Sequence, residues 1–502
     1  MEILHGFVTL FADPVALLIV VGAAFTGVVV GATPGLTTAA AIAMLVPVTF
    51  YMQPLHALAA LYVIGKAGRF GGSIAAILFN TPGTAAAAAT TLDGNALSRQ
   101  GAPGKAMKVA SVASAIGDVL GDLLLIFGAF WIASLTRKFG PPEYFAVYIA
   151  AFLVISSVVG PSVLKGLIST LAGILVAMIG TDPMEGVARL SFGSLQMQSG
   201  LTLVSLLIGM FVLAELAIQA EKAARAEGTS VISKLVPGGD RLTMPEFQRI
   251  LPVILRSSAI GAVIGVLPGL GSSVAAFAAY GQERGRAKNR EEWGKGAIEG
   301  IAAPESANNA VSGPSMIPLL ALGVPGSTIA AILLGVFLIH GIAVGPRIFV
   351  DSGELIYALF AAGLLGIGVY FLIGFYGGNA IGRVIAKVPP RVIYPYIFLS
   401  CFVSAYAART NVFDVLVMAV AGLAGYLMRK RGYSVAAFII AFVLAGGAET
   451  AFRQSLILSN DGWLIFFHRP IALAFLTFAV LAVAWRLVTV RRAATLIPKD
   501  AR

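Results

Sequence analysis

The sequence predicts an all-α polytopic membrane protein, and its composition is the first reason. Of its 502 residues, 58% are hydrophobic and only 12% are charged, and the mean hydropathy is +0.90. Soluble domains carry about 25% charged residues, so this composition excludes a soluble globular enzyme, a disordered chain and a disulfide scaffold. Long apolar runs argue against a transmembrane β-barrel, whose strands alternate apolar and polar residues. We therefore expect about 10–14 transmembrane helices.

The membrane-spanning helices are expected at apolar runs of about 14–26 residues, close to the roughly 20 that cross a bilayer. In chain order these runs are residues 16–30, 111–135, 144–159, 166–179, 201–217, 251–267, 329–342, 355–375, 392–407, 412–427, 434–446 and 463–488. Two polar stretches, residues 221–249 and 283–295, are too short to be domains and are expected to be loops.

Two further regions, residues 31–92 and 264–326, are apolar but interrupted by Gly, Pro, Ser, Thr or Asn. Apolar segments of about 10–14 residues are typical of half-helices and re-entrant hairpins. We therefore expect broken helices in both regions, at part of the 57 glycines and 24 prolines of the chain.

The two interrupted regions resemble each other and indicate an internal repeat. Residues 27–36 match 261–270, and residues 80–84 match 323–327. The predicted division is a first repeat at 1–220, a cytoplasmic linker at 221–249, a second repeat at 250–450, and an additional C-terminal helix with a basic cytoplasmic tail at 451–502.

Basic loops predict the orientation, because Lys and Arg are enriched on the cytoplasmic side. Residues 283–295, 383–391, 429–431 and the tail from 486 carry the strongest basic clusters. Placing all of them in the cytoplasm inverts one repeat relative to the other, and it places the C-terminus inside. Arg99, Lys105 and Lys108 agree with two inverted repeats, whereas Arg137 and Lys138 do not.

Four Pro-Gly turns fall in these regions, at Gly35, Gly83, Gly269 and Gly326. Pro ends a helix and Gly permits a tight turn, so a second half-helix begins there with free N–H groups. Such groups bind anions, and unwound carbonyls beside them bind cations. One Pro-Gly pair alone is equally an ordinary kink. The matched pairs favour a carboxylate site near the bilayer midplane.

Three long motifs resemble the large membrane subunit of the tripartite tricarboxylate transporters. They are GGSIAAILFNTPGT at 71–84 followed by TTLDG at 90–94, LPGLGSSVAAF at 267–277, and GAIEGIAAPESANNA at 296–310. The resemblance extends over about residues 10–450. It implies a bacterial inner-membrane carrier for di- and tricarboxylates such as citrate, driven by a Na⁺ or H⁺ gradient. It also implies a small four-helix membrane subunit and a periplasmic solute-binding protein as partners.

Several polar residues of these motifs have two interpretations. Glu305 either complements the dipole of a first helical turn or binds a cation or proton beside Asn308 and Asn309. Asn80 either ends a helix or takes part in binding. The cation-coupling candidates are Glu305, Asn309 and Asn80. The substrate-binding candidates are Thr33, Pro34, Gly35, Thr37, Asn80, Thr81, Gly83, Thr84, Gly269, Gly271, Ser272, Ser273, Asn308, Asn309, Gly326 and Ser327.

Four charged residues lie in apolar surroundings. Lys66 and Arg69 either pair with an anionic substrate or extend to the membrane interface. Asp118 and Asp122 lie four residues apart on one helix face, which indicates either a proton relay or a polar spot inside the bundle.

Enzyme chemistry finds no support in the sequence. His5, His56, His340 and His468 are scattered, and neither H-E-x-x-H nor a phosphate-binding G-x-x-x-x-G-K-[ST] occurs. We expect no metal, cofactor or nucleic acid. The predicted function is secondary active uptake by alternating access. The alternatives are a carboxylate channel, a stand-alone uniporter, or a membrane scaffold for a partner that binds the substrate.

Overall fold

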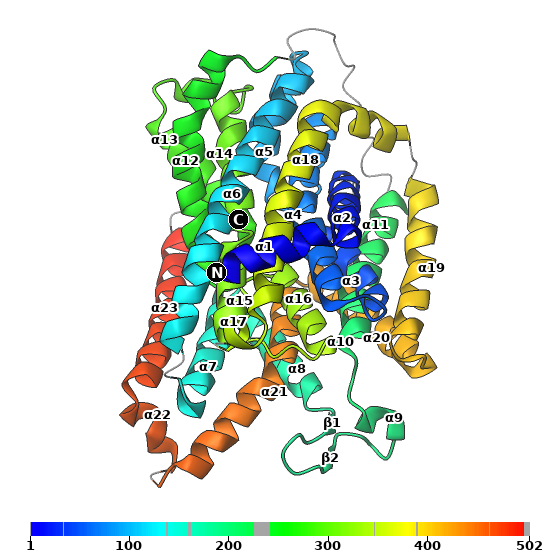
Figure 1. Ribbon diagram of the computed structural model, residues 1–502, viewed down its shortest axis with the longest axis vertical. Helices are drawn as coiled ribbons and strands as arrows, with labels where there is room; N and C mark the ends of the chain where they lie inside the picture. The colour runs from blue at the N-terminus through cyan, green and yellow to red at the C-terminus, as the bar shows by residue number, and fades with distance from the viewer. Residues whose placement is uncertain are drawn as a thin grey trace.

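The computed structural model describes residues 2–33, 35–136, 139–158, 162–224, 241–345, 347–387, 390–460 and 462–495. Pro34, Arg137 and Lys138, named above, lie outside these ranges. Figure 1 shows a helical bundle whose long helices run along the vertical axis, with a small two-stranded hairpin at its lower end.

The first half of the chain supplies helices of very unequal length. In order these elements are α1 (Glu2–Ala12), α2 (Pro14–Ala32), α3 (Thr38–Thr49), α4 (Pro54–Phe79), α5 (Ala87–Arg99), α6 (Pro103–Thr136), α7 (Pro141–Val158), α8 (Val163–Ala177), β1 (Gly180–Thr181), β2 (Ala188–Arg189), α9 (Leu195–Gln198), α10 (Leu203–Leu207), the π-helix η1 (Ile208–Leu213) and α11 (Ala214–Ala224). The strands pair antiparallel, with Gly180 opposite Arg189.

The second half repeats the mixture of long and short helices. Its elements are α12 (Met244–Val266), α13 (Gly271–Arg286), η2 (Arg290–Glu292), α14 (Ile298–Ala310), η3 (Pro314–Met316), α15 (Ile317–Leu322), α16 (Thr328–Ile339), α17 (Ile348–Asp351), α18 (Gly353–Lys387), α19 (Pro390–Arg409), α20 (Val412–Lys430), α21 (Val435–Leu458), η4 (Gly462–Leu464), α22 (Ile465–His468) and α23 (Pro470–Thr495).

Length and composition confirm the all-α polytopic fold class. Among the described residues, seven helices are long and apolar enough to cross a membrane, or eight if the pair α22–α23, bent by 84°, forms one span. Shorter apolar helices of 10–17 residues occur at α1, α3, α7, α8 and α16. The expected 10–14 crossings stay a prediction.

Glycines bring α2 and α4 into close contact. A methyl group on Gly31 would overlap the backbone of Gly68, and one on Gly71 would overlap the carbonyl of Val28. Small residues at such positions let two helix backbones approach closely. The expectation of breaks throughout residues 31–92 is therefore wrong in one part. α4 runs unbroken over 26 residues, because its glycines serve packing and not turns.

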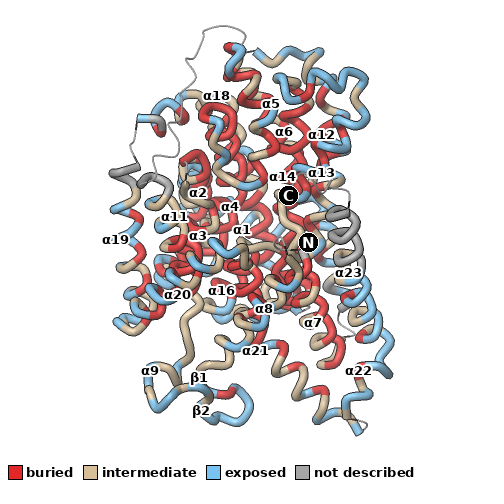
Figure 2. The backbone as a smooth tube through the Cα atoms, turned by 180° about the vertical axis from the view of Figure 1, so that it is seen from behind, coloured by how far each residue is buried: buried red, intermediate tan, exposed pale blue. Residues whose placement is uncertain are grey.

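The region 264–326 is broken as expected. It contains α13, the short helix α14, the 3₁₀ turn η3 and the six-residue helix α15. α14 packs against both α6 and α12. A methyl group on Gly117 of α6 or on Gly261 of α12 would overlap carbonyls of α14, so α14 is held between two glycine-lined helices at the buried centre (Figure 2).

Helices from the two halves exchange partners. α6, from the first half, packs on α14 and α12, and α18, from the second half, packs on α4 and α2. In the same way α8 packs on α21, and η1 packs on α20. The two halves are therefore interlocked rather than separate domains.

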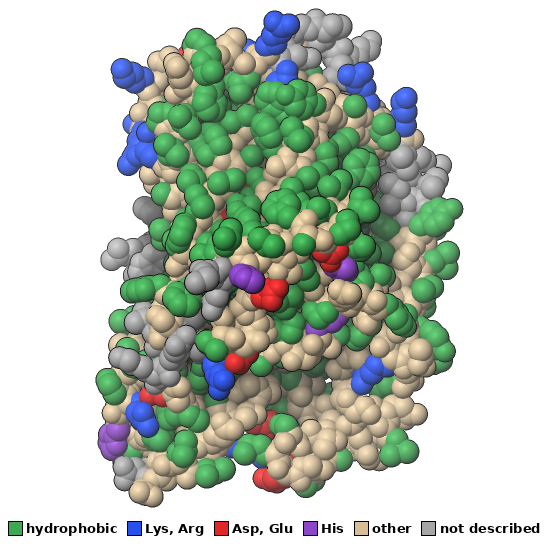
Figure 3. Space-filling view, in the orientation of Figure 1, with side chains coloured by type: hydrophobic (Ala, Val, Ile, Leu, Met, Phe, Trp, Pro, Cys, Tyr) green, Lys and Arg blue, Asp and Glu red, His purple; other side chains and the backbone are tan. Residues whose placement is uncertain are grey.

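The outer surface fits a bilayer. Large apolar side chains such as Leu18, Phe25, Leu399 and Val403 are exposed on α2 and α19. On the face drawn in Figure 3, hydrophobic side chains form a broad band, and Lys and Arg gather towards its upper end, where α13 ends.

Candidate functional site

The hydroxyls predicted at the Pro-Gly turns lie at helix starts. Thr37 before α3, Thr84 before α5 and Ser327 before α16 each accept a hydrogen bond of 3.2 Å from the backbone N–H three residues on. Thr37 and Ser327 are the N-caps of α3 and α16, so their hydroxyls satisfy first-turn N–H groups of their own helices. Thr84 lies two residues before Ala86, the N-cap of α5, and its hydroxyl accepts a hydrogen bond from the first N–H of that helix. α13 differs, because Ser272 and Ser273 follow a start that has no side-chain cap.

The turns themselves are joined in different ways. In the second half, the Gly269 N–H donates to the Gly326 carbonyl at 3.2 Å, so the two turns of that half are directly hydrogen-bonded. In the first half, the Gly83 N–H donates to the Gly72 carbonyl at 3.2 Å, while Gly35 lies against the hydroxyl of Tyr394. The two turns of the second half therefore form one unit.

Asn80 ends a helix. It is the C-cap of α4 in the left-handed conformation, with φ of 56°, and it is exposed. Its counterpart in the repeat, Gly323, caps α15 with φ of 72°. Gly and Asn are the residues that adopt this conformation most readily, so the geometry supports the helix-end interpretation of Asn80.

Glu305 lies in a cage of hydroxyl groups at the centre. Its Oε1 accepts hydrogen bonds from Ser73 of α4, at 2.6 Å, and from Thr90 of α5, and its Oε2 accepts one from Ser114 of α6, at 2.9 Å. The Glu305 side chain has no exposed surface. The expectation that Glu305 lies in a first helical turn is wrong, since α14 begins at Ile298.

Asp93 explains where α14 begins. Its Oδ1 accepts the N–H groups of Gly294, Gly296 and Ala297 at 2.8–2.9 Å, and its Oδ2 accepts the Tyr280 hydroxyl at 2.9 Å. A carboxylate is favourable at free N–H groups before a helix. Asp93 thereby fastens α5, from the first half, to α14, from the second.

Two neighbouring asparagines carry unbonded atoms. Both side-chain atoms of Asn308 and the Oδ1 of Asn309 are buried without a hydrogen-bond partner, while Asn309 Nδ2 donates to the Glu305 carbonyl at 3.0 Å. Buried polar atoms are almost always paired. These unpaired atoms are available to a ligand, and a binding role for the pair stays a prediction.

Lys66 and the two aspartates form a buried ion-pair network. Lys66 Nζ lies 2.6 Å from Asp118 Oδ1 and 2.8 Å from Asp122 Oδ1. The Tyr370 hydroxyl donates to Asp118 Oδ2 and the Tyr62 hydroxyl donates to Asp122 Oδ1, both at 3.1 Å. Lys66 therefore does not extend to the interface, and the aspartates face the interior of the bundle.

Arg69 lies one helical turn beyond Lys66 and is 7% exposed. It donates one long hydrogen bond, of 3.5 Å, to the Asn308 carbonyl, and within the described part of the chain no carboxylate forms an ion pair with it. Arg69 lines a small pocket of about 10 Å³ with Tyr62, Gly65, Ser312, Ser315, Met316, Ser327, Ile329 and Ala330. The pocket combines a guanidinium without an ion-pair partner, three serine hydroxyls, the ring of Tyr62 and the N-terminal end of α16.

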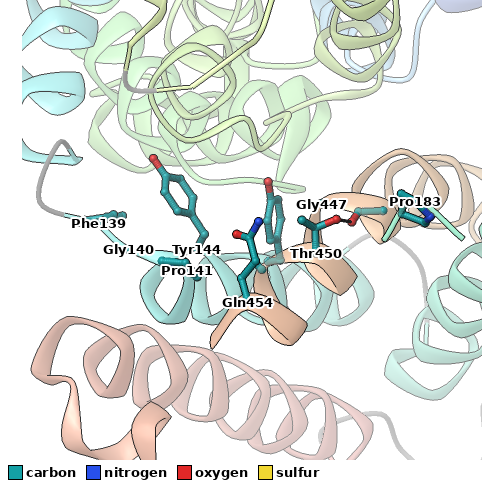
Figure 4. A pocket seen from close by; sticks show the side chains of 11 residues that line it. Phe139, Gly140, Pro141, Tyr144, Pro183, Gly447, Thr450 and Gln454 are labelled. Atoms are coloured by element: carbon teal, nitrogen blue, oxygen red, sulfur yellow. Dashed lines mark hydrogen bonds between the residues drawn. The ribbon is translucent and has the colours of Figure 1, made fainter. Parts of the chain in front are cut away.

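A larger cavity of about 520 Å³ opens elsewhere, between α7 and α21 (Figure 4). Tyr144, Tyr148, Thr450 and Gln454 line it, and none of the described residues that line it is charged. The smaller pocket differs in that it contains a buried cation, Arg69.

The sequence pointed to this pocket only in part. Of the predicted substrate-binding residues only Ser327 lines it, and Asn308 contacts it through its carbonyl. From the sequence, Arg69 is one of two cations expected either to pair with an anionic substrate or to extend to the interface, but it is not among the predicted substrate-binding residues.

A helical bundle that spans the membrane and buries charged side chains at its centre has the architecture of a membrane transport protein. Residues 17–440 match the sequence model of the family described as "Tripartite tricarboxylate transporter TctA family". The chain belongs to this family, and it is a component of a tripartite tricarboxylate transporter.

Two relatives come from Agrobacterium vitis. One, described as "Uncharacterized 52.8 kDa protein in TAR-I ttuC' 3'region", is 35% identical over 460 residues, which cover 91% of this chain and 90% of the relative. The other, "Uncharacterized protein in TAR-II ttuC' 3'region", is 34% identical over 225 residues, 44% of this chain and 92% of the relative.

Proposed function

We propose that this protein is the large permease subunit that carries organic di- or tricarboxylates across the bacterial inner membrane. Transport is secondary active uptake, coupled to Na⁺ or H⁺, and proceeds by alternating access. Its partners are a small four-helix membrane subunit and a periplasmic binding protein. No cofactor takes part, and the chain is not an enzyme.

One observation carries the proposal, namely the unpaired guanidinium of Arg69. A buried Arg is normally paired, since an isolated charge is costly in an apolar interior. Its planar fork of five N–H donors matches a carboxylate. Ser315 and Ser327 line the same pocket, and their hydroxyls supply further donors. A pocket of about one water volume is too small for a whole tricarboxylate, so binding requires the surrounding helices to separate.

The moving parts are suggested by the exchange of helix partners. α6 packs on α14 and α12, and α18 packs on α4 and α2, so we expect each of them to move with helices of the opposite half. Two inverted repeats remain part of the proposal, and the movement opens a central site to either side.

The candidate cation site is the Glu305 cage. Carboxylate, hydroxyl and carbonyl oxygens are the ligands that Na⁺ shares with other hard cations, and Glu305, Ser73, Thr90 and Ser114 provide carboxylate and hydroxyl oxygens within hydrogen-bond reach of each other. Asn309 adjoins the cage. Asn80 forms no side-chain hydrogen bond to this group in the described residues.

Counterflow in proteoliposomes tests the function. The reconstituted tripartite complex is loaded with unlabelled citrate, diluted into labelled citrate, and compared with a panel of other tri- and dicarboxylates. A carrier gives transient accumulation, which Arg69→Gln abolishes and the exposed control Arg347→Gln preserves. A channel equilibrates the label without counterflow. A stand-alone uniporter transports the label without the binding protein. A scaffold gives no uptake that depends on Arg69. Each of these results overturns the proposal.

Orientation is tested separately by labelling. Cys401 is the one cysteine of the chain, so a Cys401→Ala background accepts single cysteines at Asn289 and Asp351. The proposed cytoplasmic C-terminus predicts labelling of these two sites from opposite sides. Labelling of both from one side would contradict it.

A further inference from the structure

The Lys66 network contains two carboxylates for one ammonium group. Lys66, Asp118 and Asp122 are 0%, 0% and 1% exposed. Both aspartates belong to α6, whereas Lys66 belongs to α4. A fully buried ion pair is stable only when its charges are balanced and its remaining oxygens are hydrogen-bonded. This network satisfies neither condition completely.

One oxygen of Asp122 is left over. Asp122 Oδ1 accepts from Lys66 and Tyr62, but Asp122 Oδ2 is buried and has no hydrogen-bond partner. Asp118, in contrast, has both oxygens bonded, by Lys66 and Tyr370. The two aspartates are thus unequal, and only Asp122 has an oxygen that is free to accept a proton.

Glycines keep space around this carboxyl group. A methyl group on Gly363 of α18 would lie 3.1 Å from Asp122 Oδ2, and one on Gly313, just before η3, would lie 2.7 Å from Asp122 Oδ1. Asp122 therefore faces α18 and the segment between α14 and η3 through glycines, at the place where helices of both halves meet.

The surrounding charges also leave one negative charge uncompensated. Facing the network are Arg69 and Tyr62 from α4, Tyr370 from α18, and Glu305 from α14, which reaches Ser114 of α6. With all groups ionised except the tyrosines, Lys66 and Arg69 oppose Asp118, Asp122 and Glu305. One proton on Asp122 makes the set neutral.

We propose that Asp122 is the binding site of a coupling proton and that Lys66 and Asp118 hold it in position. A proton arriving from the outer solution forms an O–H bond at Asp122 Oδ2, while Lys66 stays paired with Asp118. After reorientation the same bond breaks and the proton leaves to the inner solution. The inference rests on the proposed carrier function. It names the proton as the coupling ion and places its site at Asp122 instead of the Glu305 cage.

The position of Arg69 links this proton to the substrate. Residues 66 and 69 are separated by about 4.5 Å along the helix axis. A carboxylate bound at Arg69 adds negative charge near Asp122 and so favours its protonation. By reciprocity, the proton strengthens binding of the anion to the same extent, and the two cross together.

The test separates exchange from gradient-driven uptake, with Asp122→Asn as the variant. The matched control is Asp414→Asn, since Asp414 is equally buried but fully paired with Arg409. Complexes in proteoliposomes are assayed with labelled citrate or the best-transported acid of the panel. In Asp122→Asn we expect counterflow within about threefold of wild type and accumulation driven by a pH gradient reduced at least about tenfold. Asp414→Asn keeps both.

Other results overturn the inference without touching the carrier function. The inference is overturned if uptake by the wild-type complex responds only to a Na⁺ gradient. It is also overturned if the Asp122→Asn variant still accumulates substrate when a pH gradient is applied. Failure of the carrier function itself appears as wild-type complex without counterflow. If Asp122→Asn does not fold, Asp122→Glu replaces it. This variant keeps a titratable group, so coupling persists with a displaced pH midpoint, and an unchanged pH profile contradicts the site.

Discussion

Replacing Lys66 by Met removes the one ammonium group of the buried network and keeps most of the aliphatic stem. Lys66 Nζ lies within 2.8 Å of oxygens from both Asp118 and Asp122, and all three side chains are buried. Removing one partner of a buried ion pair costs about 3–5 kcal/mol, because the remaining charges stay in an apolar interior. We expect Lys66→Met to lose about that free energy of unfolding.

The sharper expectation concerns the triple variant. Adding Asp118→Asn and Asp122→Asn removes the charges that Lys66 neutralised, and an uncharged replacement of a buried pair is often neutral in stability. The triple variant should therefore regain most of the loss. Unfolding in mixed detergent–SDS micelles, followed by circular dichroism, measures the free energy of unfolding of the wild type, the single variant and the triple variant. A single variant as stable as wild type, or a triple variant no more stable than the single one, would refute the reasoning.

Three further predictions concern helix packing, helix capping and the β1–β2 hairpin. Gly31→Ala should lose about 1–3 kcal/mol by overlap with α4, whereas Gly22→Ala, with open space around it, should be neutral in the same unfolding assay. Asn80→Gly should keep stability and uptake, while Asn80→Ala should lose about 1 kcal/mol from strain at positive φ; loss of uptake in Asn80→Gly would instead assign the side chain to binding. Backbone N–H groups hold the pKa of Asp182 below its usual 3.8; the stabilisation is present above that value and is lost as the pH falls through the folded pKa. Proteolysis of residues 183–200 should therefore increase below about pH 4 in wild type, and Asp182→Asn should remove that dependence.

The helices and the family were predictable because each depends on local sequence. Apolar runs and the long motifs are read directly from neighbouring residues, and they placed most helices, including α2, α12 and α20. The unbroken α4 was not predicted, because its glycines look the same in sequence whether they end a helix or pack against another. Only the presence of α2 decides between these roles.

The site depends on contacts that sequence does not reveal. Lys66 meets Asp118 and Asp122 across 52 and 56 positions, and Ser73 meets Glu305 across 232. Each residue alone has an ordinary interpretation, as a helix-end cation or a packing hydroxyl. The Pro-Gly turns drew the prediction to helix starts, where Thr37 and Ser327 are helix caps, while Arg69 lies within α4.

The most direct test of the carrier account is an experimental structure of the complex with a bound tricarboxylate, citrate or the best-transported acid of the panel. The account predicts density for a carboxylate within hydrogen-bond distance of the Arg69 guanidinium, with Ser327 or Ser315 as a further donor. Substrate density elsewhere, with Arg69 still bonded only to the Asn308 carbonyl, would contradict it.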